Sequence, residues 1–572
     1  MLLLEGIIFF LSTQSALSEW VLQHHGLPHA GEGFPRIFNL TIQWIDGAQL
    51  EPTTIELSLK QSSTVPRNIP IYSNHSDGSH QLQKLANLKH SRFYHDLSQL
   101  ASFSLTNFED GKYMMRGSFT AAGEEYEVEP FYPGIHKHSH TAKKGDHIIK
   151  RRSLSLAQDA SIDYTLPLPG SSDYERWQRL QKIANEKREN RSRQHGKEER
   201  RKRQALPSTT YVVQIYMVVD VYLYNTLTVS SQEIGWAGGV DDYVAFFMAH
   251  QANEVDVRFR SIDSSVEPVF NFWTIATKLS YLYVAKTNSS STWTFPPTVP
   301  ESLQMDALDA LNNLNFWVAT TPNLPSDADH FMLMTSLDFT SQGSNSIVGL
   351  ASVAGACGNS PVSVNELGSS TVYAHELGHN LAALHDGTSN SCNGDDSYVM
   401  APSSALTDDQ TRGNPWRFSA CSVDYFDTFI TDLNSNNANC LTNSGDYIDT
   451  WADDSLSYLG QEISVDEQCR LVHGNGFTYA TSKFDEVCSA LWCTQNSISL
   501  VAMQAAFPYT TCGNKKWCVE EQCVEDPAAP TLDEDCPFGD SPGLVFSNAD
   551  IVCANITGPV CAANQPKLCI RG

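Results

Sequence analysis

The stretch from Val372 to Asp386 places the strongest constraint on the fold of this chain, because it contains the pattern H-E-x-x-H from His375 to His379. Two histidines four residues apart on a helix lie on one face, so both imidazole rings can reach the same metal ion. Glu376 stands beside the first histidine, where a carboxylate can take a proton from metal-activated water. The pattern therefore predicts a helix with two zinc ligands and a catalytic general base.

A third histidine, His385, follows six residues after His379. At this spacing the three histidines cannot share one face of a continuous helix, so the chain has to turn between them. The turn brings a third nitrogen to the metal and leaves one position open, which is typical of catalytic zinc sites. The simpler alternative is an amphipathic core helix with surface histidines and no metal.

The cysteines are distributed unevenly, since none of the 14 occurs before Cys357. They form three blocks: Cys357, Cys392, Cys421 and Cys440; Cys469, Cys488, Cys493, Cys512, Cys518 and Cys523; and Cys536, Cys553, Cys561 and Cys569. Even numbers in each block, without C-x-x-C metal knuckles, favour disulfides formed in an oxidising compartment.

The N-terminus agrees with a secretory route. Residues 1–18 are predicted to be a signal peptide, because Met1 to Leu11 is apolar apart from Glu5 and small residues precede Glu19. No later run of 18 or more apolar residues predicts insertion in a membrane. We therefore expect a protein of the extracellular space or matrix. Glycosylation sequons occur at Asn39, Asn74, Asn190, Asn288 and Asn555.

Charge divides the chain at Arg203. Residues 1–203 contain 26 Lys and Arg against 23 Asp and Glu, whereas the remainder contains 12 against 42. Nucleic acid and anionic membranes are poor partners for so acidic a body, and the simplest interpretation of the acidity is solubility. The basic cluster Arg200 to Arg203 predicts cleavage by a furin-like convertase between Arg203 and Gln204.

Residues 19–203 are predicted to be a propeptide. Alternating apolar residues, as at 36–45 and 54–59, indicate a β-rich unit without cysteines. A helix is expected to begin near Asp173, and the highly charged run that follows, up to Arg203, is expected to be disordered.

Residues 208–445 are predicted to form an α/β catalytic domain. A buried strand is expected at 212–220, with further strands at 331–334 and 347–353 and helical spacing of apolar residues at 240–248 and 305–314. This alternation indicates a mixed sheet with helices and the metal helix below it. Residues 455–526 are expected to be a small disulfide-rich module, and residues 527–572 an unassigned cysteine-containing tail.

The zinc motif H-E-L-G-H-N-L-A-A-L-H-D, followed by Y-V-M-A-P at 398–402, resembles the metzincin zinc endopeptidases. Within them it is similar to the adamalysin or reprolysin group, which includes the ADAM and ADAMTS proteases. Further matching segments are 349–357, 418–422 and 439–443 in the catalytic domain, 126–130 and 147–152 in the propeptide, and 466–469, 488–493 and 516–518 in an ADAMTS-type cysteine-rich module. The whole looks most like short secreted invertebrate ADAM proteins.

The resemblance implies roles for further residues. It makes Met400 a support beneath the zinc that does not ligate it, and gives Asp386 a structural role. It implies disulfides Cys357–Cys440 and Cys392–Cys421. The strand at Gly349 to Ala351 becomes the sheet edge on which an extended peptide substrate pairs.

The resemblance also implies a calcium site distant from the zinc. The matching positions are Gln214, Asp329, Asn443 and the carbonyl of Cys440. Gln214 replaces a glutamate of the family and removes one charge from the cage, which weakens a site for calcium.

Two departures from the family pattern matter. The glycine three residues after the second histidine is Ala382 here, and the left-handed turn expected there costs an L-residue about 1–2 kcal/mol. Many relatives also silence their precursor with a propeptide thiolate on zinc, but no cysteine precedes Cys357. Latency must then rest on steric blockage or another ligand, with His136, His138 and His140 as conceivable substitutes and a solvated loop as the simpler interpretation.

The chain also lacks a thrombospondin repeat. These observations favour a secreted zinc metalloendopeptidase, made as a zymogen, that cleaves extracellular matrix components or secreted glycoproteins. The alternative is a matrix-binding or adhesion protein with a vestigial active site, although its His-Glu-His-His set is complete. A third interpretation makes the leader an autonomous inhibitor of the mature enzyme.

Overall fold

The computed structural model describes residues 20–194, 209–442 and 465–525. Gaps lie at 28–33, 46–51, 67, 75–79, 89, 108–112, 133–135, 137–141, 144, 153–162, 237, 263–272, 300–302, 342–346, 404–410, 412, 467, 470–476, 481–482, 484–485, 496–497, 502–505, 507–509, 514 and 520–521. The predicted signal peptide, the Arg203–Gln204 bond, Asn443, Asn555 and the tail 527–572 lie outside the described residues. The chain divides into two compact units, Met1–Ala452 and Asp453–Gly572.

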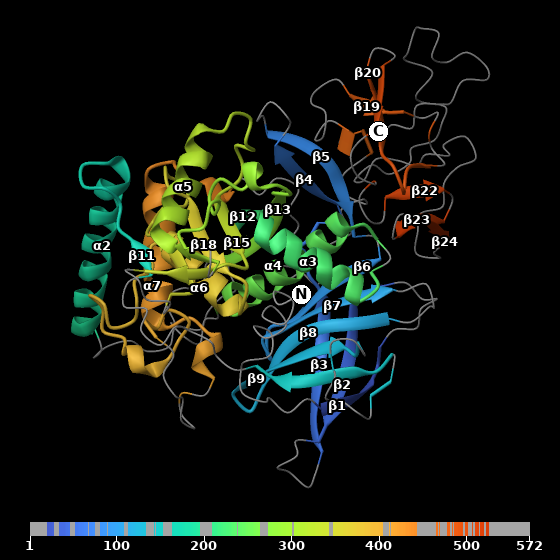
Figure 1. The fold of residues 1–572 in the computed structure, drawn as a ribbon, viewed down its shortest axis with the longest axis horizontal. Helices are drawn as coiled ribbons and strands as arrows, with labels where there is room; N and C mark the ends of the chain where they lie inside the picture. Colours follow the sequence, from blue (N-terminus) through green and yellow to red (C-terminus); the bar gives the residue numbers. More distant parts are fainter. Residues whose placement is uncertain are drawn as a thin grey trace, which may run out of the picture. The chain divides into compact units, whose positions relative to one another are not determined.

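The leader, defined here as residues 20–194, begins with a closed eight-stranded barrel, drawn in blue and cyan in Figure 1. Alternate residues of its strands point inward, as Leu40, Ile42 and Trp44 do, and fill the interior. This agrees with the β-rich unit predicted from the alternation. In barrel order the strands are β1 (Trp20–His25), β10 (His147–Arg151), β9 (Glu124–Pro130), β8 (Tyr113–Ala121), β7 (Ala101–Asn107), β6 (Ser91–Asp96), β3 (Thr53–Gln61) and β2 (Ile37–Trp44).

Residues 209–442, predicted to be catalytic and called the catalytic region below, are built on a second sheet of eight strands. Its central strand β12 (Thr209–Val219) is buried along nearly its whole length, as its apolar, β-branched sequence requires of a strand covered on both faces. Strands β13 (Trp273–Val284), β15 (His330–Thr335) and β18 (Val362–Glu366) continue the sheet in parallel, and β17 (Gly349–Ser352) is antiparallel to β18. Strands expected at 212–220, 331–334 and 347–353 are therefore present.

Helices cover both faces of this sheet (Figure 1). One face packs against α3 (Val221–Glu233), α4 (Val240–Arg260), α6 (Ser370–Asn380) and α7 (Ala420–Ser435), and the other against α5 (Ala307–Thr320). Asp220, Asp306, Ser369 and Ser419 cap helix N-termini through their side chains. Short elements complete the region: β14 (Gln304–Asp306), β16 (Asp338–Thr340), η1 (Asn288–Ser290), η3 (Gly394–Asp396), η4 (Asn414–Trp416) and η5 (Cys440–Thr442).

The leader supplies the outer strands at both ends of the catalytic sheet. The hairpin β4 (Asn68–Asn74) and β5 (His80–Asn87) joins beside β13, and the two-residue strand β11 (Tyr164–Thr165) pairs in parallel with β17. The order across the sheet is β11-β17-β18-β15-β12-β13-β4-β5. Both edges of the catalytic sheet are thus covered by leader residues, which the sequence did not predict.

A leader helix, α2 (Ser172–Gln194), packs against α7 (Figure 1). The sequence predicts a helix that begins near Asp173, but it also predicts disorder in the charged run, whereas the helix continues to Gln194. Glu, Lys, Arg and Gln dominate this run, and they are good helix formers whose charges alternate at helical spacing. The prediction of disorder is therefore wrong up to Gln194.

Buried polar contacts join the barrel to α4. Glu254, with no exposed surface, accepts hydrogen bonds from Ser118 Oγ (2.9 Å) and from Arg152 Nη1 (3.2 Å). Nearby, Nη2 of Arg258 lies 2.5 Å from Oε1 of Glu125. Charges are rarely buried unless they are paired, so these pairs tie the leader to α4.

The second unit is a small module of short strands: β19 (Thr478–Tyr479), β20 (Trp492–Gln495), β21 (Ile498–Val501), β22 (Thr511–Gly513), β23 (Lys516–Val519) and β24 (Gln522–Glu525). Its core consists largely of half-cystines, in the disulfides Cys469–Cys493, Cys488–Cys518 and Cys512–Cys523. Among the described residues of the chain, no helix is long and apolar enough to span a membrane.

Candidate zinc centre

Helix α6 carries the first two predicted ligands, and the chain turns directly after it. The helix ends at Asn380, and Ala382 then adopts a left-handed conformation with φ of 76°. The backbone N–H of Ala383 closes the turn by donating to the carbonyl of Gly378 at 3.0 Å. This is the turn that the sequence requires to bring His385 back to the helix, with an alanine where a glycine is favoured.

The three histidines converge on one point. Nε2 of His375 lies 3.0 Å from Nε2 of His379 and 3.2 Å from Nε2 of His385. All three side chains are buried. Tetrahedral zinc, with bonds of about 2.0–2.1 Å to nitrogen, sets its ligand atoms about 3.3 Å apart, so the spacing suits one ion.

Backbone carbonyls orient two of the three rings. Nδ1 of His375 donates to the carbonyl of Val399 at 2.5 Å, and Nδ1 of His379 donates to that of Ala383 at 2.8 Å. Because a carbonyl only accepts, Nδ1 holds a proton and Nε2 is left to face the centre, where a neutral ring presents a lone pair to a metal. The site therefore has the donor set and outer support of a zinc centre, and the residues fit the metal.

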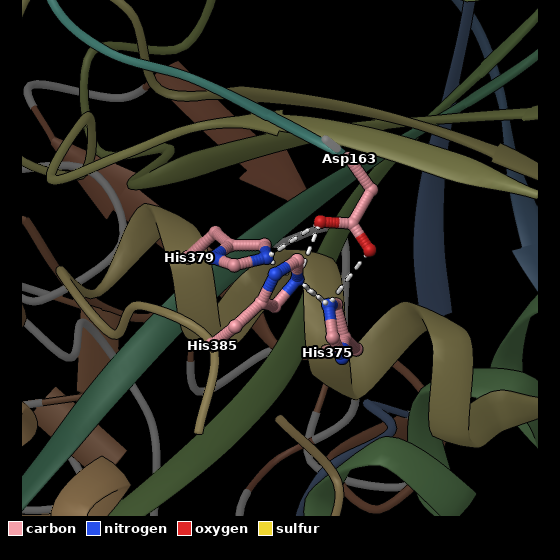
Figure 2. Close-up of side chains that lie close together, drawn as sticks. All are labelled: Asp163, His375, His379 and His385. Carbon is pink, nitrogen blue, oxygen red and sulfur yellow. Dashed lines mark hydrogen bonds and ion pairs between the residues drawn. The ribbon is translucent and has the colours of Figure 1, made fainter. Parts of the chain in front are cut away.

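A fourth side chain meets the same point, and it comes from the leader. Figure 2 shows the carboxylate of Asp163 over the three imidazole rings. Its Oδ1 lies 2.6 Å from Nε2 of His385 and 3.2 Å from that of His379, and its Oδ2 lies 3.2 Å from that of His375. Burial opposes its ionisation, but the facing His375 and His385 hold the pKa of Asp163 well below its usual value.

Asp163 was not predicted from the sequence, which offered His136, His138 and His140 of the leader as conceivable ligands. His136 is buried within the leader, where it lies 3.2 Å from Glu129 and accepts from the backbone N–H of Tyr132. His138 and His140 lie outside the described residues. The one sequence signal for such a ligand was the lack of a cysteine in the leader, because without a thiolate the precursor needs another ligand or a steric block.

Glu376 also faces the centre from α6. Its side chain is buried, and its Oε2 has no hydrogen-bond partner among the described residues. Burial, and after it the charge of Asp163, raises the pKa of Glu376 well above its usual value. A Cβ at Gly349 of β17 would collide with Oε1 of Glu376, so a glycine here leaves room for the carboxylate at the sheet edge.

The residues with predicted structural roles surround the site. Met400 is buried beneath α6, and a Cβ added at Gly378 would lie 2.6 Å from its sulfur. The backbone N–H of Asp386 donates to the carbonyl of Met400 at 2.9 Å, and its Oδ1 accepts from Ser419 at 2.6 Å. These contacts fix the chain on both sides of His385.

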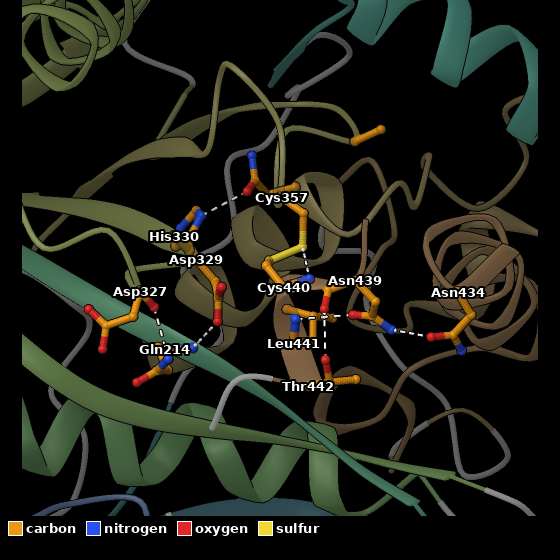
Figure 3. The surroundings of a disulfide bond; sticks show 12 residues. Gln214, Asp327, Asp329, His330, Cys357, Asn434, Asn439, Cys440, Leu441 and Thr442 are labelled. Atoms are coloured by element: carbon orange, nitrogen blue, oxygen red, sulfur yellow. Dashed lines mark hydrogen bonds between the residues drawn. A yellow bond between two sulfur atoms is a disulfide. The ribbon is translucent and has the colours of Figure 1, made fainter. Parts of the chain in front are cut away.

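The structure contains the disulfides Cys357–Cys440 and Cys392–Cys421, the two pairs that the resemblance implies. The first lies beside the predicted calcium residues (Figure 3), where the carboxylate of Asp329 is within 4.8 Å of both sulfurs. The amide of Gln214 is engaged elsewhere, with the carbonyl of Asp327 at 2.9 Å and Ser280 at 3.3 Å. Its backbone N–H donates to Asp329. The calcium site stays a prediction.

Two of the glycosylation sequons can be placed on the surface. Asn39 in β2 and Asn288 in η1 are exposed. The side chains of Asn74 and Asn190 lie outside the described part of the chain, as does Asn555. Exposure at Asn39 and Asn288 is what attachment of a glycan requires, and use of the sequons stays a prediction.

Comparison with known proteins agrees with this geometry. Residues 293–445 match the model of the "Reprolysin (M12B) family zinc metalloprotease", and residues 459–524 match "ADAMTS cysteine-rich domain 2". The chain is similar to "A disintegrin and metalloproteinase with thrombospondin motifs" adt-1 of Caenorhabditis elegans, at 32% identity over 34% of this chain and 13% of that protein. It is also similar to the human "A disintegrin and metalloproteinase with thrombospondin motifs 6", at 37% identity over 31% of this chain. The human protein numbered 10 in the same series is 34% identical over 34% of this chain.

The chain spans only 13 to 17% of the length of these three relatives. The two family models nevertheless match both the region of the three histidines and the cysteine-rich module. The chain therefore contains a region similar to reprolysin-type zinc metalloproteases and a region similar to the ADAMTS cysteine-rich domain, so it resembles the ADAM/ADAMTS-like metzincins.

Proposed function

We propose that the protein is a secreted zinc metalloendopeptidase, made as a precursor, that cleaves extracellular matrix or secreted glycoprotein substrates. The observation that carries the proposal is the convergence of three histidine Nε2 atoms at one point, with the buried carboxylate of Glu376 on the helix that carries two of them. A structural zinc site has four protein ligands and no base, whereas this arrangement has a glutamate poised beside the ligand set.

His375, His379 and His385 hold the ion in this proposal. When bound, zinc supplies a Lewis acid that activates water and polarises a peptide carbonyl. Glu376 accepts the proton of the attacking water and then delivers it to the leaving amine. Its burial suits this role, because a carboxyl withdrawn from bulk solvent has a raised pKa and can also act as an acid.

Strand β17 favours an extended peptide as the substrate. The leader pairs with this strand as β11, with backbone hydrogen bonds from Ala351 N–H to the carbonyl of Asp163 (3.2 Å) and from Val353 N–H to that of Thr165 (2.9 Å). The same donors serve a substrate strand once the leader has left. Pairing of this kind selects polypeptides over small molecules.

The biosynthetic route is part of the proposal. The predicted signal peptide at 1–18, five disulfides among the described residues and the basic cluster before Gln204 support secretion followed by cleavage with a furin-like convertase. The cysteine-rich module would then dock the enzyme on its substrate.

Glu376→Ala tests the function. The chain beginning at Gln204, freed of its leader, should bind one zinc ion and cleave a denatured protein, and the variant should keep the zinc but lose at least about 1000-fold in rate. Ser391→Ala, at an exposed position beyond the site, is the matched control. Retained cleavage in the Glu376 variant rejects the mechanism.

The same experiment separates the competing class of function. A vestigial matrix-binding protein would bind matrix through its cysteine-rich module and cleave no peptide in either form. Zinc bound without cleavage, in a folded chain without its leader, would therefore favour that alternative.

A further inference from the structure

We propose that Asp163 of the leader is the fourth zinc ligand of the uncleaved chain, so that a carboxylate closes the site where relatives use a thiolate. The inference rests on zinc binding by the three histidines, which is part of the proposed function. Asp163 is buried, with 6% of its surface exposed, and its two carboxylate oxygens lie within 3.2 Å of all three histidine Nε2 atoms.

The hydrogen-bonding pattern favours a cation among these four side chains. The Nδ1 atoms of His375 and His379 already donate to backbone carbonyls, so the Nε2 atoms of these rings are the ones that face the carboxylate. When both rings are neutral, a carboxylate at this distance faces two lone pairs, which repel it. A zinc ion among the four converts the repelling atoms into ligands, and carboxylate oxygen is an ordinary ligand for zinc.

The backbone places Asp163 precisely enough for this role. It directly precedes β11, whose two residues pair with Ala351 and Ser352 of β17. The ring of Tyr164, the next residue, lies 4.8 Å from that of His379 and 5.2 Å from that of His385, measured between centroids. The leader therefore occupies both the open metal position and the sheet edge assigned to the substrate.

Helix α2 anchors this segment beyond the site. Asp173 accepts from the backbone N–H of Asn359 at 3.0 Å. Arg176 donates to the carbonyls of Ala354 and Cys357, with its guanidinium over the ring of Phe429. The bond after Arg203 lies beyond α2, so its cleavage leaves these contacts intact. Activation then requires departure of the leader after the cut, and the cut alone is insufficient.

The test compares uncut precursors, with the basic cluster altered to prevent processing, as wild type, Asp163→Ala and Asp163→Asn. The readout is the rate at which excess EDTA removes zinc. Both variants should lose zinc at least tenfold faster, since the asparagine keeps the shape of aspartate but is a weaker zinc ligand. Asp146→Ala is the control, because this leader carboxylate contacts the backbone of Lys143 and no site residue.

X-ray absorption at the zinc edge of the wild-type precursor needs no variant. It should report three nitrogen ligands and one carboxylate oxygen, and the leader-free chain should lose the carboxylate. Once the leader is removed, all variants leave chains of the same sequence, so these chains should release zinc at one rate. Any difference in zinc release between the uncut precursors is then due to the leader.

The outcomes separate this inference from the proposed function. A precursor that holds no zinc overturns both. A precursor that holds zinc, with equal EDTA release from wild type and both Asp163 variants and a water in place of the carboxylate, overturns the role of Asp163 alone. Faster release with a lost carboxylate signal supports it.

Discussion

The Oδ1 atom of Asp163 lies 3.2 Å from Nε2 of His379, although 216 residues separate the two along the chain. The contact joins the leader to the candidate metal centre at the position that a catalytic zinc site keeps open. If the proposed function holds, latency and catalysis depend on the same few atoms, and the leader is part of the site for as long as it stays bound.

Gly349→Ala should impair catalysis without loss of zinc. The added methyl group collides with the carboxylate of Glu376 and displaces it from the sheet edge. A displacement near 1 Å of a catalytic group costs about 100-fold in rate, so kcat/KM should fall at least that far. Gly413→Ala, where a Cβ meets no atom within 4 Å, is the control. Unchanged kcat/KM in the Gly349 variant would show that Glu376 is not the base.

Arg176→Ala should weaken retention of the leader after the cut at Arg203. The variant loses two hydrogen bonds from a charged group, one of them buried, and its contact with Phe429, worth about 2–3 kcal/mol together, or about 30–150-fold in Kd. Arg179→Ala removes a half-exposed partner of Asp432 and should cost under about 1 kcal/mol. The check is the dissociation rate of the cut leader, and equal rates for both variants would contradict the anchoring role of α2.

Acid should loosen the leader through His95. Nε2 of this buried side chain donates to the carbonyl of Asn253 in α4 at 3.0 Å, and Asp256 and Arg260 also face it. Burial is the main cause that lowers the pKa of His95 to about 4, against about 6.5 when exposed. The dissociated leader therefore binds more protons. The affinity of the leader for the rest of the chain should be full above pH 6.5 and should fall as the pH drops toward 4. The binding free energy should weaken by up to about 3 kcal/mol over this range.

The measurement is Kd of the cut leader from pH 7.5 to 4.5. His95→Gln keeps a donor for the Asn253 carbonyl but does not titrate, so its pH slope should be shallower. His250 on α4, whose pKa burial also lowers to about 4, remains to titrate. A slope unaffected by His95→Gln would assign the pH dependence to other groups.

Glu254→Gln should destabilise the precursor. The substitution removes a buried charge that faces Arg152 and leaves part of the Arg152–Glu125 cluster uncompensated, so the free energy of unfolding should fall by about 2–3 kcal/mol. Asp242→Asn, which alters a partly exposed pair with Lys84, should cost less than about 1 kcal/mol. Urea denaturation of the uncut chains checks the difference, and similar midpoints for both would contradict it.

Most of the site could be predicted from the sequence because the residues that mark it lie within one short segment. The four-residue spacing puts His375 and His379 on one face of a helix with Glu376 beside them, and the distance to His385 required the turn that Ala382 makes with φ of 76°. Buried strands such as β12 were also predictable, since a continuous β-branched run admits few other structures.

The strands and the carboxylate that the leader adds to the catalytic sheet and the site could not be predicted, because they depend on pairing between distant segments. Strand β11 has two residues and no pattern of its own, and the hairpin β4–β5 looks like any other part of the barrel sequence. Nothing in their composition distinguishes a strand that joins the barrel from one that joins the catalytic sheet. Asp163 was missed for the same reason, since a lone carboxylate carries no spacing signal.

The most direct test is a crystal of the uncut precursor measured on both sides of the zinc absorption edge. The account predicts one anomalous peak within about 2.0–2.2 Å of the Nε2 atoms of His375, His379 and His385, with a carboxylate oxygen of Asp163 as the fourth ligand. Zinc absent from the three histidines, in crystals grown with zinc, would contradict the central claim.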